Sequence, residues 1–405
     1  MGLIYHSCSY CIVYWVELCR AIFYISQKSA AEYVFAKNAF GSNFVAFIVG
    51  CLIVFVALVS AATVAIGFAG YISVFFPQAP ELLYALALIG VLSFVNFYGI
   101  RESVWTNVVF TLIELAGLVI IILGGLVLSP GAAIDFFETP ATTSPLASAS
   151  AYVLVLSAAA LIFFAYFGFE NMANIAEETK NAPKVIPRAL LASILITTAV
   201  YILVAISALD LVGWKELSLS DAPLAIAAGN AFGDRGTLML CIVALFATSN
   251  TVLMMLIAGS RIIFGIAKNG AFPARLARIH PTRRTPWAAV IISTIVAVIA
   301  VMVSSGNIES IASIAVFSIF IEYGFVNLSL IWLRYRQPEL KRQFVSPGRI
   351  GKFPIVAGLG FISSLAMLSQ FSIITIIAGI STVAASILLY KVLNRRTSLT
   401  ANKTS

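Results

Sequence analysis

Long apolar stretches, separated by short polar connections, follow one another along the chain. A helix that crosses a bilayer needs about 20 apolar residues, and eleven stretches fit such a span: 3–25, 44–76, 82–99, 104–128, 151–176, 187–209, 236–262, 286–304, 310–333, 353–369 and 371–390. The last two share one charge-free run, 353–390, which as a single helix would extend about 57 Å. The hydrocarbon core is only about 30 Å thick. We therefore predict two spans there, with a turn near Ser369 and Gln370.

Composition places the chain among integral membrane proteins. Of its 405 residues, 61% are apolar and 10% are charged, and the mean hydropathy is +1.01. A soluble globular domain does not need so much apolar material. Because every backbone N–H and C=O in hydrocarbon must be paired internally, the apolar spans are expected to be helices. The prediction is an all-α polytopic membrane protein with one domain.

The distribution of basic residues predicts the orientation. With the N-terminus outside and alternating spans, 23 of the 25 Lys and Arg residues fall on the cytoplasmic side, as expected in the cytoplasmic membrane. The C-terminus is then cytoplasmic. The outside holds Lys215, Arg235, the loop 129–150 and a short helix expected within 213–230. The same bias explains the net charge of +8, so no nucleic-acid partner is predicted.

Cysteines and histidines do not form a recognisable reactive site. The cysteines all lie in apolar stretches, and the first two have CxxC spacing without a second pair or a His cluster: Cys8, Cys11, Cys19, Cys51 and Cys241. We interpret them as small buried side chains and predict no metal and no cofactor. A membrane enzyme would need paired catalytic residues, such as a G-x-G-D motif, and "AFGD" at 231–234 lacks the first glycine. An enzyme is therefore not predicted.

The stretch "FFAYFGFENMANIAEE", 163–178, interrupts apolar residues with a glycine and a carboxylate. Irregular backbone is tolerated within a membrane only where it lines a cavity, and transporters use such breaks to offer bare backbone groups to ligands. Gly168 lacks a Cβ, and Glu170 begins a polar second half. We predict a helix break at 165–168. The alternative is a continuous helix in which glycine and aromatic residues are ordinary constituents.

Four acidic residues lie within predicted spans, and three of them are functional candidates; the fourth, Glu17, lies near the cytoplasmic end of its span and is interpreted as an interfacial cap. Buried carboxylates in membranes are costly, and they usually pair or carry protons. Glu114 and Glu322 lie near the middle of their spans, and Glu170 lies about one turn inside a cytoplasmic end. Each is a candidate for gating or proton coupling. An interhelical hydrogen bond is the alternative for Glu114 and Glu322, and an interfacial position in contact with water is the alternative for Glu170.

Two polar loops stand out. In "EETKNAPKVIPRA", 177–189, Pro183 and Pro187 end one helix and start the next, and Pro187 suits a first helical position. The segment "RIIFGIAKNGAFPARLARIHPTRRTP", 261–286, is a basic amphipathic loop that suits the anionic headgroups of the inner leaflet.

Several of these motifs occur together in a known superfamily. The stretch 163–178 followed by "KNAPKVIPRA", the loop 260–286, and "VELCRAIFYISQKSAAEYVFAKNAFG" at 16–41 resemble, over nearly the whole chain, the amino acid–polyamine–organocation (APC) permease superfamily. The resemblance implies an APC-type (LeuT-type) inverted-repeat helical bundle with about 11 transmembrane helices, the family's 12 without the first. The whole chain, 1–405, is then a single domain. Residues 1–128 are the remainder of the first repeat and 151–333 are the second repeat. Residues 353–390 form two extra helices, and 391–405 form a cytoplasmic tail.

The resemblance also implies a substrate site at the break. Phe164 falls at the aromatic gate position of the superfamily, Ala165 and Phe167 would offer carbonyls to a substrate ammonium, and Gly168 would be the hinge. Phe163 completes the expected substrate-binding residues.

Glu170 matches a pattern of proton-linked relatives, whereas Glu114 departs from one. Glu170 falls where several relatives keep an acid linked to proton sensing or gating. Glu114 falls in the fifth-span region, where some proton-coupled relatives place a lysine. This departure leaves the coupling ion open.

The implied function is secondary active transport of an amino acid, with a proton as the coupling partner, by alternating access within the lipid bilayer. The Phe-rich break favours a neutral or apolar substrate. The alternative is a truncated or degenerate permease that folds without transporting, because the chain resembles the superfamily only from its second span onward. On that expectation, a reading frame upstream of Met1 encodes the glycine-rich broken first span.

Overall fold

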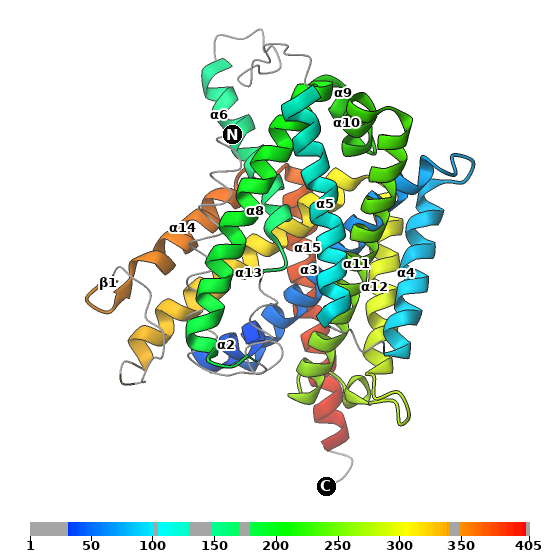
Figure 1. Cartoon of the computed structure of the whole chain (residues 1–405). Coiled ribbons are helices and arrows are strands. Elements are labelled where there is room, and N and C mark those ends of the chain that lie inside the picture. Colours follow the sequence, from blue (N-terminus) through cyan, green and yellow to red (C-terminus); the bar gives the residue numbers. More distant parts are fainter. Residues whose placement is uncertain are drawn as a thin grey trace.

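The chain folds as a bundle of long helices (Figure 1). A computed structural model describes residues 31–99, 104–128, 147–169, 179–337, 339 and 349–401. The elements are α2 (Ala31–Phe40), α3 (Asn43–Ser73), α4 (Glu81–Tyr98), α5 (Val104–Leu128), α6 (Ala147–Ile162), η1 (Phe163–Tyr166), α8 (Ala182–Val212), α9 (Trp214–Ser218), α10 (Pro223–Phe232), α11 (Asp234–Lys268), η3 (Ala274–Ala277), α12 (Trp287–Ser304), α13 (Ile308–Arg336), β1 (Arg349–Ile350), β2 (Phe353–Pro354), α14 (Ile355–Leu368) and α15 (Ile373–Ala401).

The predicted all-helical fold class is confirmed. The strands found in the described ranges, β1 and β2, form one short antiparallel hairpin that pairs Arg349 with Pro354 and Ile350 with Phe353. The helix in the predicted span 353–369 is α14, and it begins two residues later than predicted, at Ile355.

Eight described helices are long and apolar enough to cross a membrane, namely α3, α4, α5, α8, α11, α12, α13 and α15. Each coincides with a predicted span, while α6 and α14 carry shorter apolar segments. The interval between α14 and α15 contains Ser369 and Gln370, so the predicted turn is confirmed. The predicted span 3–25 lies outside the described residues.

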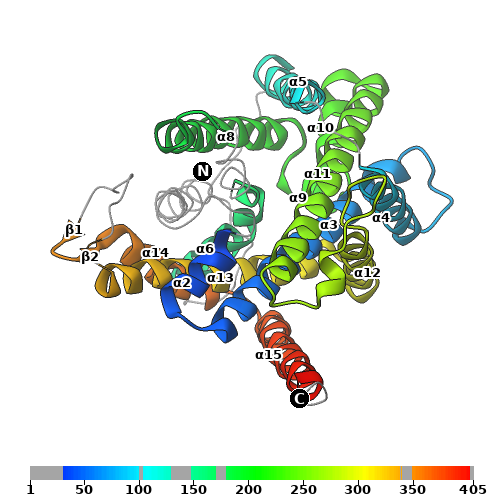
Figure 2. The same ribbon diagram turned by 90° about the horizontal axis from the view of Figure 1, so that it is seen from below.

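Helices α3 and α13 form the centre of the bundle. In their most apolar windows 78% and 72% of the residues are buried, against 17–28% in the other six spanning helices. Ala61, Ala65 and Ala69 on α3 are fully buried and recur every four residues, so they share one helix face. Small residues on such a face allow helices to approach closely within a membrane. Figure 2 shows α4, α5, α8 and α15 around the periphery.

Two connections differ from expectation. The region 213–230 holds two short helices, α9 and α10, where one was predicted. The prediction that Pro187 occupies a first helical position is wrong, because α8 already begins at Ala182 and Pro187 lies inside it. Pro183 lies in the first turn, where a proline's fixed φ is compatible with a helix and its missing N–H is not needed. The helix therefore starts about one turn before Pro187.

The contact between α5 and α8 is tight at Gly125. A Cβ on Gly125 would lie 2.6 Å from the Cα of Ser207 on α8, and the Ser207 hydroxyl donates to the carbonyl of Ile122 on α5 at 3.4 Å. Because the close neighbour is backbone, it cannot move aside as a flexible side chain could.

We expect Gly125→Ala to lower the thermal stability of the protein, because overpacking of this kind costs about 1–3 kcal/mol. The matched control is Gly90→Ala on α4, where a Cβ would meet nothing within 4 Å. Alanine favours a helix over glycine by about 1 kcal/mol, so the control should be neutral or stabilised. Thermal unfolding of the purified variants measures both effects. Equal stabilisation of the two variants would show that α5 and α8 do not approach closely at Gly125.

Candidate substrate site

One apolar helix gives way to irregular backbone within the predicted span 151–176. Regular α-helix ends at Ile162, where α6 gives way to the 3-10 helix η1. Phe167 then has φ −68° and ψ 138°, and Gly168 has φ +115°, a conformation that residues with a side chain rarely adopt. The backbone thus leaves the regular helix within the predicted break at 165–168. The part of the span expected beyond it, from Glu170 onward, lies outside the described residues.

Aromatic packing against α13 holds the start of the break. Phe163 is 2% exposed. Its ring centroid lies 4.9 Å from that of Phe320 and 5.7 Å, edge-to-face, from that of Tyr323. Aromatic pairs of this kind contribute about 0.5–1.5 kcal/mol beyond their area burial. Phe163 is thus an anchor that fixes η1 against the central helix α13.

Hydroxyl groups of α8 hold the other side of the break. The hydroxyls of Tyr166 and Thr198 are 3.0 Å apart. Thr198 donates to the carbonyl of Ile194 at 2.7 Å, so Tyr166 is the donor in the pair. The Tyr201 hydroxyl donates to the carbonyl of Ala165 at 3.1 Å. The Ala165 carbonyl was predicted to face a substrate ammonium, and it has a second lone pair that can still accept a hydrogen bond.

The remaining predicted residues lie where the packing opens. Phe164 is half-buried and packs against two hydrophobic clusters, one around η1, α8 and α13 and the other around α3 and α11. Ala165 is exposed, and a Cβ on Gly168 would meet no described atom within 4 Å. Among the described residues, no atom therefore crowds the position of a Gly168 side chain.

The predicted acidic residues are not equally close to the break. Glu322 is 3% exposed and lies on α13, one residue before Tyr323, whose ring contacts Phe163. Glu114 is half-buried on α5, and the main neighbours of α5 are α8, α10 and α11. The structure therefore brings Glu322 to a helix that packs on the break, whereas Glu114 lies on a peripheral helix.

Three residues that hold the break were not singled out from the sequence: Thr198, Tyr201 and Tyr323. Thr198 and Tyr201 are three positions apart in an apolar span, so they share a helix face, and polar groups at membrane depth need partners. That spacing is a signal that could have identified them. Tyr323 has no comparable signal apart from its neighbour Glu322.

These observations define the class of protein. Broken helices within a multi-span bundle are the means by which secondary transporters present backbone groups to a substrate. The chain is a multi-pass membrane protein with such an irregular segment next to its central helix. Residues 2–393 match the family described as Amino acid permease, and the chain belongs to that family, which confirms the resemblance to the APC permeases. It is a transporter, not an enzyme.

Three named transporters are similar over most of the chain. The branched-chain amino acid permease BcaP of Bacillus subtilis is 24% identical over 389 residues, 91% of this chain and 80% of that protein. The methylthioribose transporter of the same species is 25% identical over 74% of this chain and 62% of its own length. The low-affinity putrescine importer PlaP of Escherichia coli is 27% identical over 68% of this chain and 61% of its own length.

Proposed function

We propose that the protein carries an amino acid across the cytoplasmic membrane by secondary active transport, coupled to protons and operating by alternating access. The observation that carries this proposal is the break at η1 and Gly168, because it presents main-chain groups next to a half-buried aromatic ring, Phe164. The carbonyls of Ala165 and Phe167 would receive the substrate ammonium, and Gly168 would be the hinge.

The proposed domain organisation follows the inverted repeats of the superfamily. In it, 1–128 belongs to the first repeat, 151–333 is the second, and 353–390 supplies two extra helices. The broken helix then begins the second repeat, and its tight packing on α13 joins two helices of the same repeat. The segment 391–405 would be a cytoplasmic tail, and it starts within α15, which continues to Ala401.

A neutral, apolar amino acid is the proposed substrate class. Phe163, Phe164 and Phe167 surround the break with aromatic rings, and the similarity to BcaP covers 91% of the chain. Because the chain is also similar to a putrescine importer, a polyamine is the main alternative substrate class. A dication would need carboxylates at both ends, and the described residues of the break, 163–169, include none.

Counterflow in proteoliposomes tests the proposal. Vesicles that contain the purified protein and are loaded with leucine should take up labelled leucine. Excess valine should inhibit the uptake, and excess putrescine should not. An imposed pH gradient, acidic outside, should drive accumulation that a protonophore abolishes. Absence of exchange for every amino acid tested would overturn the proposed transport, whereas exchange without pH-driven accumulation would overturn only the proton coupling.

The proposed orientation has an accessible test. In a cysteine-free background, Lys215→Cys on α9 and Arg278→Cys after η3 place single thiols at exposed positions near opposite ends of the bundle. A membrane-impermeant maleimide added outside intact cells should label position 215, and it should label position 278 only after permeabilisation. The reverse pattern would contradict the orientation derived from the positive-inside rule.

A further inference from the structure

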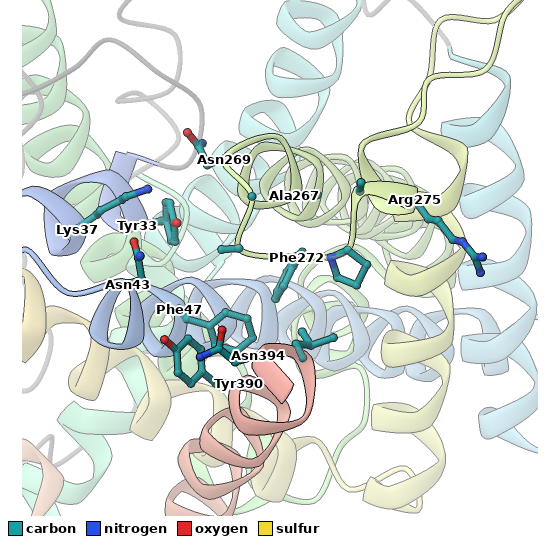
Figure 3. A pocket seen from close by; sticks show the side chains of 15 residues that line it. Tyr33, Lys37, Asn43, Phe47, Ala267, Asn269, Phe272, Arg275, Tyr390 and Asn394 are labelled. Atoms are coloured by element: carbon teal, nitrogen blue, oxygen red, sulfur yellow. The ribbon is translucent and has the colours of Figure 1, made fainter. Parts of the chain in front are cut away.

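A polar cavity of about 760 Å³ opens where α2, the loop after α11 and the C-terminal part of α15 meet (Figure 3). Two T-shaped aromatic contacts form its floor. Phe47 lies 5.3 Å from Phe272 and 5.3 Å from Tyr390, between ring centroids. Figure 3 shows Lys37 and Arg275 at opposite sides of this floor, with the Arg275 side chain directed outward and Asn394 beside Tyr390. The cavity therefore joins helices that are far apart in the sequence.

The cavity carries positive charge without a balancing acid. Lys37 and Arg275 are the charged residues among its described lining residues, which include no Asp or Glu. Lys37 lies over the ring of Tyr33, with Nζ 6.0 Å from the ring centroid. The acid nearest along α2 is Glu32, which is 3% exposed, and burial raises the pKa of its carboxyl. Charge complementarity thus favours an anionic occupant.

A second hollow, an apolar groove of about 580 Å³, continues from the polar cavity. The two share Phe272, Pro273 and Leu393. The groove runs between α15 and the helices α3, α11 and α12, with apolar side chains such as Phe55 and Val296 along it. It therefore extends from the charged end of the bundle along part of α15, from Leu393 to Ser381.

Three hydroxyl residues line the groove without making it polar. Ser381, Thr382 and Ser386 each donate to a carbonyl of their own helix, at 2.6, 2.6 and 2.8 Å. With their hydroxyl donors used within α15, these side chains have no proton left to donate into the groove. The apolar window of α15 is only 17% buried, so the groove lies on a side of the bundle that faces lipid.

We propose that the polar cavity and the apolar groove together bind one anionic phospholipid. Its headgroup phosphate would lie in the cavity beside Lys37, with Arg275 adding positive charge at the opposite rim, and an acyl chain would fill the groove beside α15. One molecule with an anionic end and an apolar chain matches both hollows and their junction at Phe272 and Pro273. A free phosphate would match the polar cavity alone, and a second copy of the protein would cover the groove without satisfying the two cations.

Native mass spectrometry of the purified full chain tests this proposal with three probes: phosphatidylglycerol, phosphatidylcholine and inorganic phosphate. Phosphatidylglycerol should be retained as a 1:1 adduct, more strongly than phosphatidylcholine. Lys37→Gln and Arg275→Gln should each weaken the binding of phosphatidylglycerol about fivefold, which is the effect of one basic residue at a membrane surface. The matched control is Arg278→Gln, an exposed basic residue three positions further on that lines neither hollow.

A second pair of variants separates the groove from the cavity. Ala385→Trp, which fills the groove, should lower lipid retention without changing thermal stability, and Ala384→Trp on the adjacent exposed position should not. Equal retention of both lipids by the wild type, or no effect of Lys37→Gln and Arg275→Gln, would overturn the proposal. So would phosphate competing as strongly as the lipid, or dimer formation that Ala385→Trp abolishes in the absence of lipid.

Discussion

Gly168→Leu is expected to weaken amino acid binding by about 5- to 150-fold while leaving the amount of folded protein nearly unchanged. Gly168 has φ +115°, which costs a residue with a side chain about 1–3 kcal/mol. A Cβ there would meet no described atom within 4 Å, so the expectation rests on the backbone angle. The variant escapes the strain by changing its backbone angles. That change displaces Phe167 and the carbonyls of the break, and the strain corresponds to a loss of affinity of about 5- to 150-fold.

A second glycine provides the control for this prediction. Gly306, between α12 and α13, also has a positive φ, +83°, and a Cβ added to it would likewise meet no described atom within 4 Å. Gly306→Leu should cost comparable stability and leave leucine binding intact. Binding is measured by ligand-induced thermal shift or equilibrium dialysis, alongside the yield of monodisperse protein. Wild-type binding by Gly168→Leu would place the substrate elsewhere in the bundle.

Helix positions were predictable from the sequence wherever polar residues interrupt an apolar run. The predicted span 104–128 has the same bounds as α5, and the span predicted at 286–304 differs from α12 by one residue. Hydropathy identifies the part of a helix within the membrane, but it does not identify where the helix ends. For that reason α15 continues to Ala401, well beyond the predicted end of its span at 390, and α2 was not predicted as a helix at all.

The local part of the site was also predictable. The break at Gly168 was inferred because glycine next to a carboxylate is unusual in an apolar stretch, and this signal is contained in a few adjacent residues. The contacts of Tyr201 with Ala165 and of Phe163 with Tyr323 join residues 36 and more positions apart. They depend on α8 and α13 packing beside η1, and hydropathy alone does not determine which helices become neighbours.

Glu322→Gln is expected to uncouple transport from the proton gradient while preserving exchange. Glu322 is 3% exposed on α13, the helix that packs on the break through Phe320 and Tyr323. A carboxyl group buried at this depth is costly unless it pairs or carries a proton. Glutamine keeps the shape and the hydrogen-bonding capacity of the side chain but cannot release a proton. The variant should therefore still cycle with bound substrate, and the proton gradient should no longer bias that cycle.

The expected size of the effect follows from the driving force. With one proton per substrate and the membrane potential clamped, a gradient of about one pH unit supports about tenfold accumulation. Glu322→Gln should reduce that ratio to about one, with leucine counterflow at the wild-type rate. The control is Glu309→Gln, which changes an exposed acid at the start of the same helix and should retain full accumulation.

If Glu322 acts only through an interhelical hydrogen bond, counterflow and accumulation should change together, and this joint change would exclude Glu322 as the proton carrier. Retained accumulation in Glu322→Gln with its loss in Glu114→Gln would instead assign coupling to the peripheral helix α5.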